Sequence, residues 1–258
     1  MYIGVMNDPA KPVYEEVLAI GRAGYDFVDL TIEGPNAREI SVDRMLSTLE
    51  QGHLFVVGHT DPCLPYAYPI PSVREVCFRE LERCAQLFTA LGARIMNIHP
   101  CYACPPKMRL ALVELNITAL KSIVAMADSY GLTVVFENYK APFDRVATFQ
   151  ILLQEVPGLQ VHLDFGHANL GKNAAEDFCR RLGSQIKHVH FSDNRSIGDD
   201  HIPLGAGNID WRSSVNALKA CGYDGTVTLE IFANESAVFF QYLDVSRRFL
   251  LDLWNRPG

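Results

Sequence analysis

The chain has 258 residues, of which 48% are hydrophobic and 21% are charged, and its formal net charge at pH 7 is −7. This composition is typical of a globular protein with a large core. The acidic balance excludes a large basic field for nucleic acid over the whole molecule, although it is compatible with a local basic patch.

The N-terminal stretch MYIGVMNDPAKP predicts a strand. It lacks the basic segment followed by an apolar segment that a signal peptide requires. No apolar run in the sequence approaches the length needed to cross a membrane. We therefore expect a cytoplasmic protein with no membrane partner.

Short apolar runs alternate with longer amphipathic segments along the whole chain. The short runs predict eight strands, at Tyr2–Met6, Phe27–Ile32, Leu54–Gly58, Arg94–His99, Thr133–Glu137, Gln160–Asp164, Ile186–Phe191 and Thr226–Ile231. The longer segments predict eight helices, near 12–24, 41–52, 72–91, 107–131, 144–156, 173–183, 211–221 and 235–253.

The residues at the predicted helix ends agree with this alternation. Ser41 and Ser72 are candidate N-caps. Glycines follow four helices directly before a strand, as C′ glycines do, at Gly24, Gly92, Gly131 and Gly222. Strict alternation predicts parallel strands joined by crossover helices, and the count of eight favours a closed (β/α)8 TIM barrel over an open sheet. We expect one α/β domain over residues 1–258, and no GxGxxG motif follows the first strand to indicate a dinucleotide.

Polar side chains gather where the predicted strands end. In a (β/α)8 barrel the active site lies at the carboxyl ends of the strands. Strands three to eight each end at, or run into, a histidine or a carboxylate, one further histidine lies just beyond strand six, and the loop after strand seven adds two more residues. The nine residues are His59, His99, Glu137, Asp164, His167, His190, Asp199, His201 and Glu230.

The seventh strand contains the stretch HVHFSDN, in which two histidines point the same way because strand side chains alternate. His190 is nearer the carboxyl end and is the candidate metal ligand. His188 lies one layer deeper, where we expect a hydrogen-bonded core residue or a support for its neighbour.

Several carboxylates in one concave site repel one another and raise each other's pKa. A bound cation removes this conflict. Oxygen and imidazole ligands together suit Mn²⁺, Mg²⁺, Co²⁺, Zn²⁺ or Fe²⁺, and the lack of a thiolate at these positions argues against a structural zinc centre.

At these residues the sequence resembles the xylose-isomerase-like TIM-barrel superfamily. The resemblance covers essentially the whole chain and is carried by FEN at 136–138, LDFGH at 163–167, HVHFSDN at 188–194, DDHIPLGAGNIDW at 199–211 and TLEIF at 228–232. That group unites sugar isomerases and epimerases with the endonuclease IV type of abasic-site nuclease (AP endonuclease family 2).

For a sugar epimerase, the resemblance implies one divalent ion held by Glu137, Asp164, His190 and Glu230. It also implies that the two glutamates are the catalytic acid and base, one on each face of a small sugar or sugar phosphate. The ion would polarise a carbonyl and stabilise an enediolate while a carboxylate takes the proton. His167 would contact a substrate hydroxyl.

For an endonuclease IV-like enzyme, the resemblance implies up to three zinc ions. The additional ligands would be His59, His99, His167, Asp199 and His201, and all five are present. Such a cluster favours hydrolysis of a phosphodiester at abasic sites in DNA.

We favour the epimerase. The chain is acidic, its loops are short, and basic residues near the rim, such as Arg38, Arg145 and Arg195, are isolated, whereas duplex binding uses many phosphate contacts.

Further candidates for substrate contact are Asn138, which alternatively ties down its turn, Arg195 and Tyr66. Cys101 and Cys104 form a lone CxxC that we interpret as ordinary thiols. The aromatic last helix packs on the barrel or forms a homo-oligomer interface.

Overall fold

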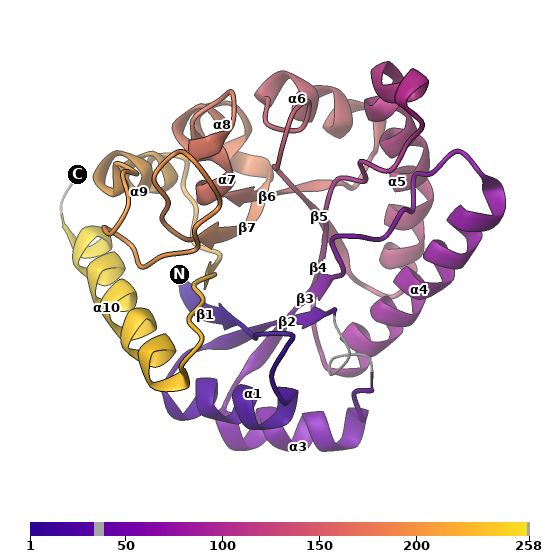
Figure 1. The fold of residues 1–258 in the computed structure, drawn as a ribbon. Coiled ribbons are helices and arrows are strands. Elements are labelled where there is room, and N and C mark those ends of the chain that lie inside the picture. The colour runs from indigo at the N-terminus through magenta and orange to yellow at the C-terminus, as the bar shows by residue number, and fades with distance from the viewer. Residues whose placement is uncertain (34–38, 257–258) are drawn as a thin grey trace.

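The computed structural model describes residues 1–33 and 39–256, and its centre is a closed barrel of eight parallel strands (Figure 1). Each strand pairs with the next along the chain, and the first pairs with the last to close the barrel. The (β/α)8 prediction is confirmed. The strands are β1 Tyr2–Met6, β2 Phe27–Ile32, β3 Phe55–Thr60, β4 Ile95–Ile98, β5 Thr133–Glu137, β6 Gln160–Asp164, β7 Ile186–Phe191 and β8 Thr226–Leu229.

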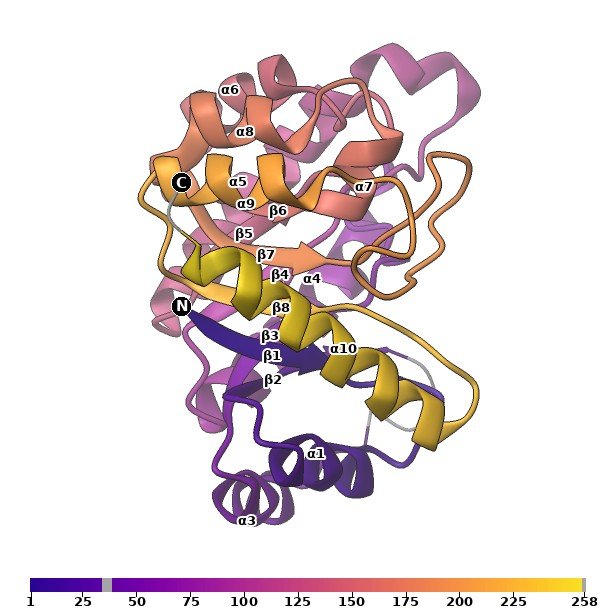
Figure 2. The ribbon, with the colours of Figure 1, turned by 90° about the vertical axis from the view of Figure 1, so that its left-hand side faces the viewer.

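Helices surround the barrel on its outside (Figures 1 and 2). They are α1 Val13–Arg22, α3 Val42–Gly52, α4 Pro71–Ala90, α5 Leu112–Ser129, α6 Val146–Glu155, α7 Phe165–Leu170, α8 Ala175–Leu182, α9 Trp211–Ala220 and α10 Ser236–Asn255, with 3₁₀ turns at Pro106–Ala111 and Gly183–Gln185. The short helix α7 was not predicted from the sequence. It begins directly after β6, where the side chain of Asp164 caps it by accepting from the backbone N–H of His167.

The predicted helix ends are confirmed except at one position. Ser41 caps α3 by accepting from the backbone N–H of Arg44 at 3.4 Å. Ser72 is not an N-cap, because α4 begins one residue earlier at Pro71, whose missing N–H and fixed φ suit a first helical position. The four C′ glycines all have φ between 72° and 79°, the left-handed conformation that ends a helix.

One helical stretch, Pro106–Ser129, is long and apolar enough to cross a membrane by length and composition alone. The prediction that no run approaches that length is therefore too strong. Its most apolar window is 44% buried, and α5 packs against α4 and β5. A core helix of a soluble barrel has these same properties.

The barrel interior is polar as well as apolar. Interiors of this fold are usually filled by branched apolar side chains. Here five fully buried polar side chains come from strands β2, β4, β6, β7 and β8: Asp29, Asn97, His162, His188 and Thr228. Parallel pairing puts Asp164 beside His190 on neighbouring strands, so the polar layer continues up to the carboxyl rim.

Glu16 is a buried carboxylate that fixes the loop between β1 and α1. Its Oε2 accepts from the backbone N–H of Asp8 at 2.9 Å, and Lys11 Nζ lies 3.9 Å from Oε1. Burial raises the pKa of Glu16 from 4.5 to about 7, and the cation of Lys11 offsets this only in part. The charged form is therefore disfavoured in the folded chain.

We predict that Glu16→Gln stabilises the protein at pH 8 but not at pH 5. The unfolded chain loses the Glu16 proton near pH 4.5 and the folded chain near pH 7, so the stability of the wild type falls across this window. The glutamine removes this loss, which amounts to about 3 kcal/mol at most. Urea denaturation at both pH values measures the difference, with the exposed neighbour variant Glu15→Gln as the control. An effect of Glu16→Gln that is equal at both pH values contradicts the prediction.

Candidate functional site

The carboxyl ends of the strands bring all nine predicted rim residues into one cluster. Glu137, Asp164 and His190, from β5, β6 and β7, each offer a ligand atom within 4.8 Å of the others. Glu230 follows β8, and its Oε2 lies 3.2 Å from His190 Nδ1. The four residues that the resemblance assigns to one ion are thus adjacent and buried.

The remaining five residues flank this set on two sides. On one side, His59, His99 and Glu137 form a second group within 4.8 Å, with His99 Nε2 3.0 Å from Glu137 Oε2. On the other side, Asp199 Oδ2 lies 2.9 Å from His167 Nε2 and 3.3 Å from His201 Nε2.

Three buried polar atoms of the central set have no hydrogen-bond partner. They are Asp164 Oδ2, His190 Nδ1 and Glu230 Oε2. Buried polar atoms are almost always paired, so three neighbouring unpaired atoms mark a place where another group binds. A carboxylate oxygen, an imidazole nitrogen and a second carboxylate oxygen are all ligands of divalent cations.

The carboxylates of the rim have shifted pKa values of opposite direction. Burial, together with the charges of Glu230 and Glu137, raises the pKa of Asp164 to about 7. Burial also acts to raise the pKa of Glu230, but His201 and His190 outweigh it and lower that pKa to about 2. The protein's own groups therefore leave Asp164 incompletely charge-balanced.

The layer below the rim contains residues that the sequence interpretation missed. Asp29 Oδ2 lies 2.7 Å from His190 Nε2 and 3.0 Å from His188 Nε2, and it accepts from Thr228 Oγ1 at 2.9 Å. His188 also contacts Thr226 Oγ1 at 2.7 Å, so it is a hydrogen-bonded core residue, as expected.

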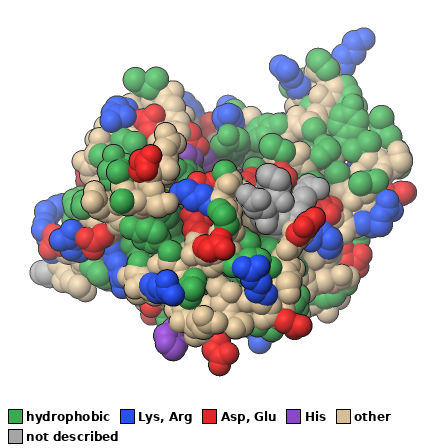
Figure 3. Space-filling view, turned by 60° about the horizontal axis from the view of Figure 1, so that its bottom comes forward, with side chains coloured by type: hydrophobic (Ala, Val, Ile, Leu, Met, Phe, Trp, Pro, Cys, Tyr) green, Lys and Arg blue, Asp and Glu red, His purple; other side chains and the backbone are tan. Residues whose placement is uncertain are grey.

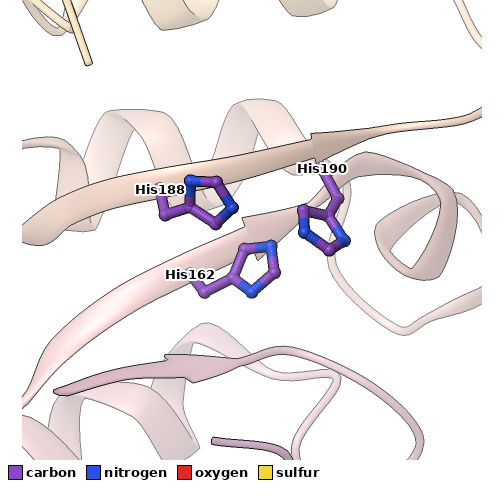
Figure 4. Close-up of side chains that lie close together, drawn as sticks. All are labelled: His162, His188 and His190. Atoms are coloured by element: carbon purple, nitrogen blue, oxygen red, sulfur yellow. The ribbon is translucent and has the colours of Figure 1, made fainter. Parts of the chain in front are cut away.

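His162 was also missed, and it supports Glu137. Figure 4 shows its ring, on β6, facing those of His188 and His190 on β7. His162 Nδ1 lies 3.1 Å from Glu137 Oε2, which also accepts from Asn97 Nδ2 at 2.9 Å. In the sequence, these residues could have been found as polar side chains within an otherwise apolar strand, at positions whose side chains alternate toward the barrel interior.

Three predicted substrate contacts do not face the cluster. Both polar groups of the Asn138 side chain bond the backbone of Asp164, so this residue ties down its turn. Tyr66 is buried, and its hydroxyl bonds the backbone oxygen of His99 and Oδ1 of Asn116. Arg195 is exposed beside Asp200, at 3.5 Å.

The loop after β7 is anchored by Asp193. This fully buried carboxylate accepts from the backbone N–H of Gly205 at 2.8 Å and of Ile209 at 3.3 Å, and from the indole Nε1 of Trp211 at 2.9 Å. It does not contact a predicted metal ligand through these bonds. Its role is to hold the loop that carries Asp199 and His201.

Two cavities adjoin the rim. The first, which we call the β8 cavity, has a volume of about 810 Å³ and opens onto Glu230 and His201. The second has a volume of about 430 Å³ and reaches His167 and Asp199 from the opposite side. The rim cluster is therefore accessible to a small molecule from two directions.

Basic side chains do not gather at the rim within the described part of the chain. Arg38 lies outside the described residues. Arg145 Nε is 3.5 Å from Asp144, and Arg195 is the residue already seen beside Asp200. On the face shown in Figure 3, Lys and Arg side chains are scattered among Asp and Glu.

Cys101 and Cys104 form no disulfide within the described residues. Burial raises the pKa of the Cys101 thiol, which favours its protonated form.

Comparison with known proteins gives one family match. The family described as xylose isomerase-like TIM barrel matches residues 17–248. An uncharacterised protein of Methanocaldococcus jannaschii is 32% identical over 153 residues, 54% of this chain, and the match spans about half, 51%, of that protein.

Two other similar proteins have epimerase names. The L-ribulose 3-epimerase of Methylomonas sp. is 35% identical over 235 residues, 85% of this chain and 78% of that protein. The crystal structure of a D-tagatose 3-epimerase-like protein superposes with a TM-score of 0.82 over 97% of this chain and 100% of the other. At 23% identity, the structural likeness shows the shared fold.

Proposed function

This chain belongs to the xylose isomerase-like TIM barrel family, and on that premise we propose that it is a divalent-metal-dependent epimerase or isomerase of a small sugar. The observation that carries the proposal is the set of unpaired ligand atoms on Asp164, His190 and Glu230, at the rim where this fold places its active sites. The name of the Methylomonas relative supports a sugar as the substrate.

The donor set fits a hard or borderline divalent ion, with Mn²⁺, Mg²⁺, Co²⁺, Zn²⁺ and Fe²⁺ all compatible. Glu137, Asp164, His190 and Glu230 would hold one such ion. Its charge would offset the burial, and the repulsion by Glu230 and Glu137, that raise the pKa of Asp164 to about 7.

Asp29 supports this assignment through the tautomer of His190. Burial acts to raise the pKa of Asp29, but the surrounding histidines hold it well below its usual range, so Asp29 is ionised. An ionised carboxylate only accepts hydrogen bonds, and His190 Nε2 at 2.7 Å must therefore carry the proton. Burial acts to lower the pKa of His190, but the carboxylates of Glu230 and Asp29 hold it well above its usual range, so Nδ1 also carries a proton when no ion is bound. An ion would replace that proton at Nδ1 while Nε2 keeps its bond to Asp29, as in carboxylate–histidine–metal arrangements.

When bound, the ion would polarise the substrate carbonyl and lower the barrier to losing the neighbouring C–H proton. The protein's groups then move that proton. Glu137 approaches from β5 and Glu230 from β8, so two carboxylates flank the space above His190. One takes the proton from the carbon and the other returns a proton to the opposite face, which inverts the configuration. His167, whose Nδ1 lies 3.1 Å from Glu137 Oε1, would hold a substrate hydroxyl beside this pair.

A second candidate function is hydrolysis of a phosphodiester. Two groups of side chains that flank the central set favour it. One group is His59 and His99, and the other is His167, Asp199 and His201. Together with Glu137 and Glu230, these groups would hold up to three ions. The scattered, carboxylate-paired arginines of the described rim count against a DNA duplex as substrate.

We predict that Glu137→Gln and Glu230→Gln each lower kcat by roughly 10² to 10⁴-fold, because each removes one proton-transfer group. The measurement is epimer interconversion by metal-loaded protein, together with deuterium uptake from D₂O at the reacting carbon. Glu155→Gln, an exposed glutamate on α6, is the matched control. Full activity in either rim variant contradicts the acid–base assignment.

We predict that Asp29→Asn weakens Mn²⁺ binding roughly 10- to 100-fold, because the amide no longer fixes the His190 tautomer. Calorimetric titration of the metal-free protein measures this affinity directly. Glu16→Gln removes another buried carboxylate, which bonds the loop after β1 and contacts no predicted metal ligand, and it should leave the affinity unchanged. Equal Mn²⁺ affinities for the wild type and Asp29→Asn would contradict the proposed role of Asp29.

We predict one tightly bound ion per chain by elemental analysis, and no incision of a DNA duplex with a single abasic site in the presence of Zn²⁺ or Mn²⁺. Three ions per chain together with incision would overturn the epimerase proposal in favour of the hydrolase.

A further inference from the structure

The β8 cavity is the larger opening onto the rim and is built from loops that follow β1, β2, β7 and β8. The lining residues that bear on its chemistry are Asp8, Glu33, His201, Glu230, Phe232, Glu235 and Tyr242. Because Glu230 is both a lining residue and a neighbour of His190, a substrate that reaches the proposed acid–base pair extends into this cavity.

The charged groups of this lining are almost all negative. Four of them are carboxylates, Asp8, Glu33, Glu230 and Glu235, and no lysine or arginine is present among the described lining residues. His201 already faces Asp199 at 3.3 Å and Glu230 at 3.5 Å.

Lys11, the basic residue that contacts Asp8, also interacts with two other side chains. Lys11 Nζ lies 3.3 Å from Asp8 and 3.9 Å from Glu16, and it sits over the Phe239 ring at 4.8 Å. The amino end of α10, which also borders the cavity, has the carboxylate residue Glu235 at its N-cap. A carboxylate there offsets the positive end of the helix dipole that would otherwise attract an anion.

We infer that the chain acts on an unphosphorylated sugar, whose uncharged hydroxyl-bearing end occupies the β8 cavity. This inference rests on the proposed function. Carboxylates accept hydrogen bonds from sugar hydroxyls, and Phe232 and Tyr242 offer apolar surface to the C–H face of a sugar. Among the described lining residues, a phosphate would meet four carboxylates and no arginine or lysine, and the imidazole of His201 already lies beside Asp199 and Glu230. Such a lining disfavours an anionic ligand.

The second cavity does not provide the missing cation. Its lysine, Lys140, lies over the Tyr139 ring at 4.7 Å, and the same lining includes the carboxylates of Asp144 and Asp199. A substrate that extended in this direction would also meet no excess of positive charge.

The test compares matched sugar pairs with Mn²⁺-loaded protein: L-ribulose against L-ribulose 5-phosphate, D-tagatose against D-tagatose 6-phosphate, and D-allulose against D-allulose 6-phosphate. We expect kcat/KM to be on the order of 100-fold higher for the free sugar of the best pair. Equal or faster turnover of the phosphorylated member overturns this inference while leaving the proposed function in place. If no member of any pair is bound or converted, the proposed function is wrong and this inference falls with it.

Charge reversal at the cavity mouth gives a second readout. Glu235→Lys places a cation in the lining at an exposed residue whose side chain makes no capping bond. We expect it to raise kcat/KM for the sugar phosphate roughly 10-fold relative to the free sugar. Asp244→Lys makes the same charge change on an exposed residue of α10 outside the cavity, and it should leave the ratio unchanged. An equal change of the ratio in both variants contradicts the role of the β8 cavity.

Discussion

The hydrogen bonds of one buried carboxylate organise the interior of this barrel. Asp29 is fully buried on β2, and a charge in that position persists only where several donors surround it. Those donors come from the other side of the barrel, from His188 and His190 on β7 and Thr228 on β8. The contact therefore fixes two imidazoles at once. It also determines which nitrogen of His190 is free to face the rim.

The rim above this layer shows the opposite balance. Asp29 has donors for its charge, but Asp164, one row higher and beside His190, lacks a partner for Oδ2 and has a pKa raised to about 7. Unpaired atoms of Asp164, His190 and Glu230 lie next to one another at the carboxyl ends of the strands, which suits a ligand that arrives from outside. The same lower layer, through His162 and Asn97, holds Glu137 Oε2 in place. The proposed proton transfer thus depends on side chains that never touch the substrate.

The sequence was sufficient to predict the fold and the rim, because both follow from the alternation of side chains along a strand and from the order of strands and helices along the chain. Alternating strand and helix segments implied the barrel, and the residue that ends each strand must lie at one rim. The sequence was insufficient where position depends on contacts across the barrel. Asp29 and His162 sit in apolar strands, and only closure of the barrel brings Asp29 to His190. The sequence also could not show how the loop side chains of Tyr66 and Asn138 are bonded. Tyr66 bonds the backbone of His99 and the side chain of Asn116, and Asn138 follows the alternative of tying down its turn through the backbone of Asp164.

The choice between proton transfer and phosphodiester hydrolysis depends on the surroundings of the rim more than on its ligands. The nine rim residues are compatible with either reaction, since carboxylates and imidazoles bind metal in both. What differs is the substrate each reaction requires. A polyanionic duplex needs many cationic contacts, whereas a sugar needs hydrogen-bond acceptors and an apolar face in a closed space. The β8 cavity, which Glu230 lines, offers carboxylate acceptors and the aromatic rings of Phe232 and Tyr242. The described lining of this cavity includes four carboxylates and no lysine or arginine, and this local charge favours a small uncharged sugar.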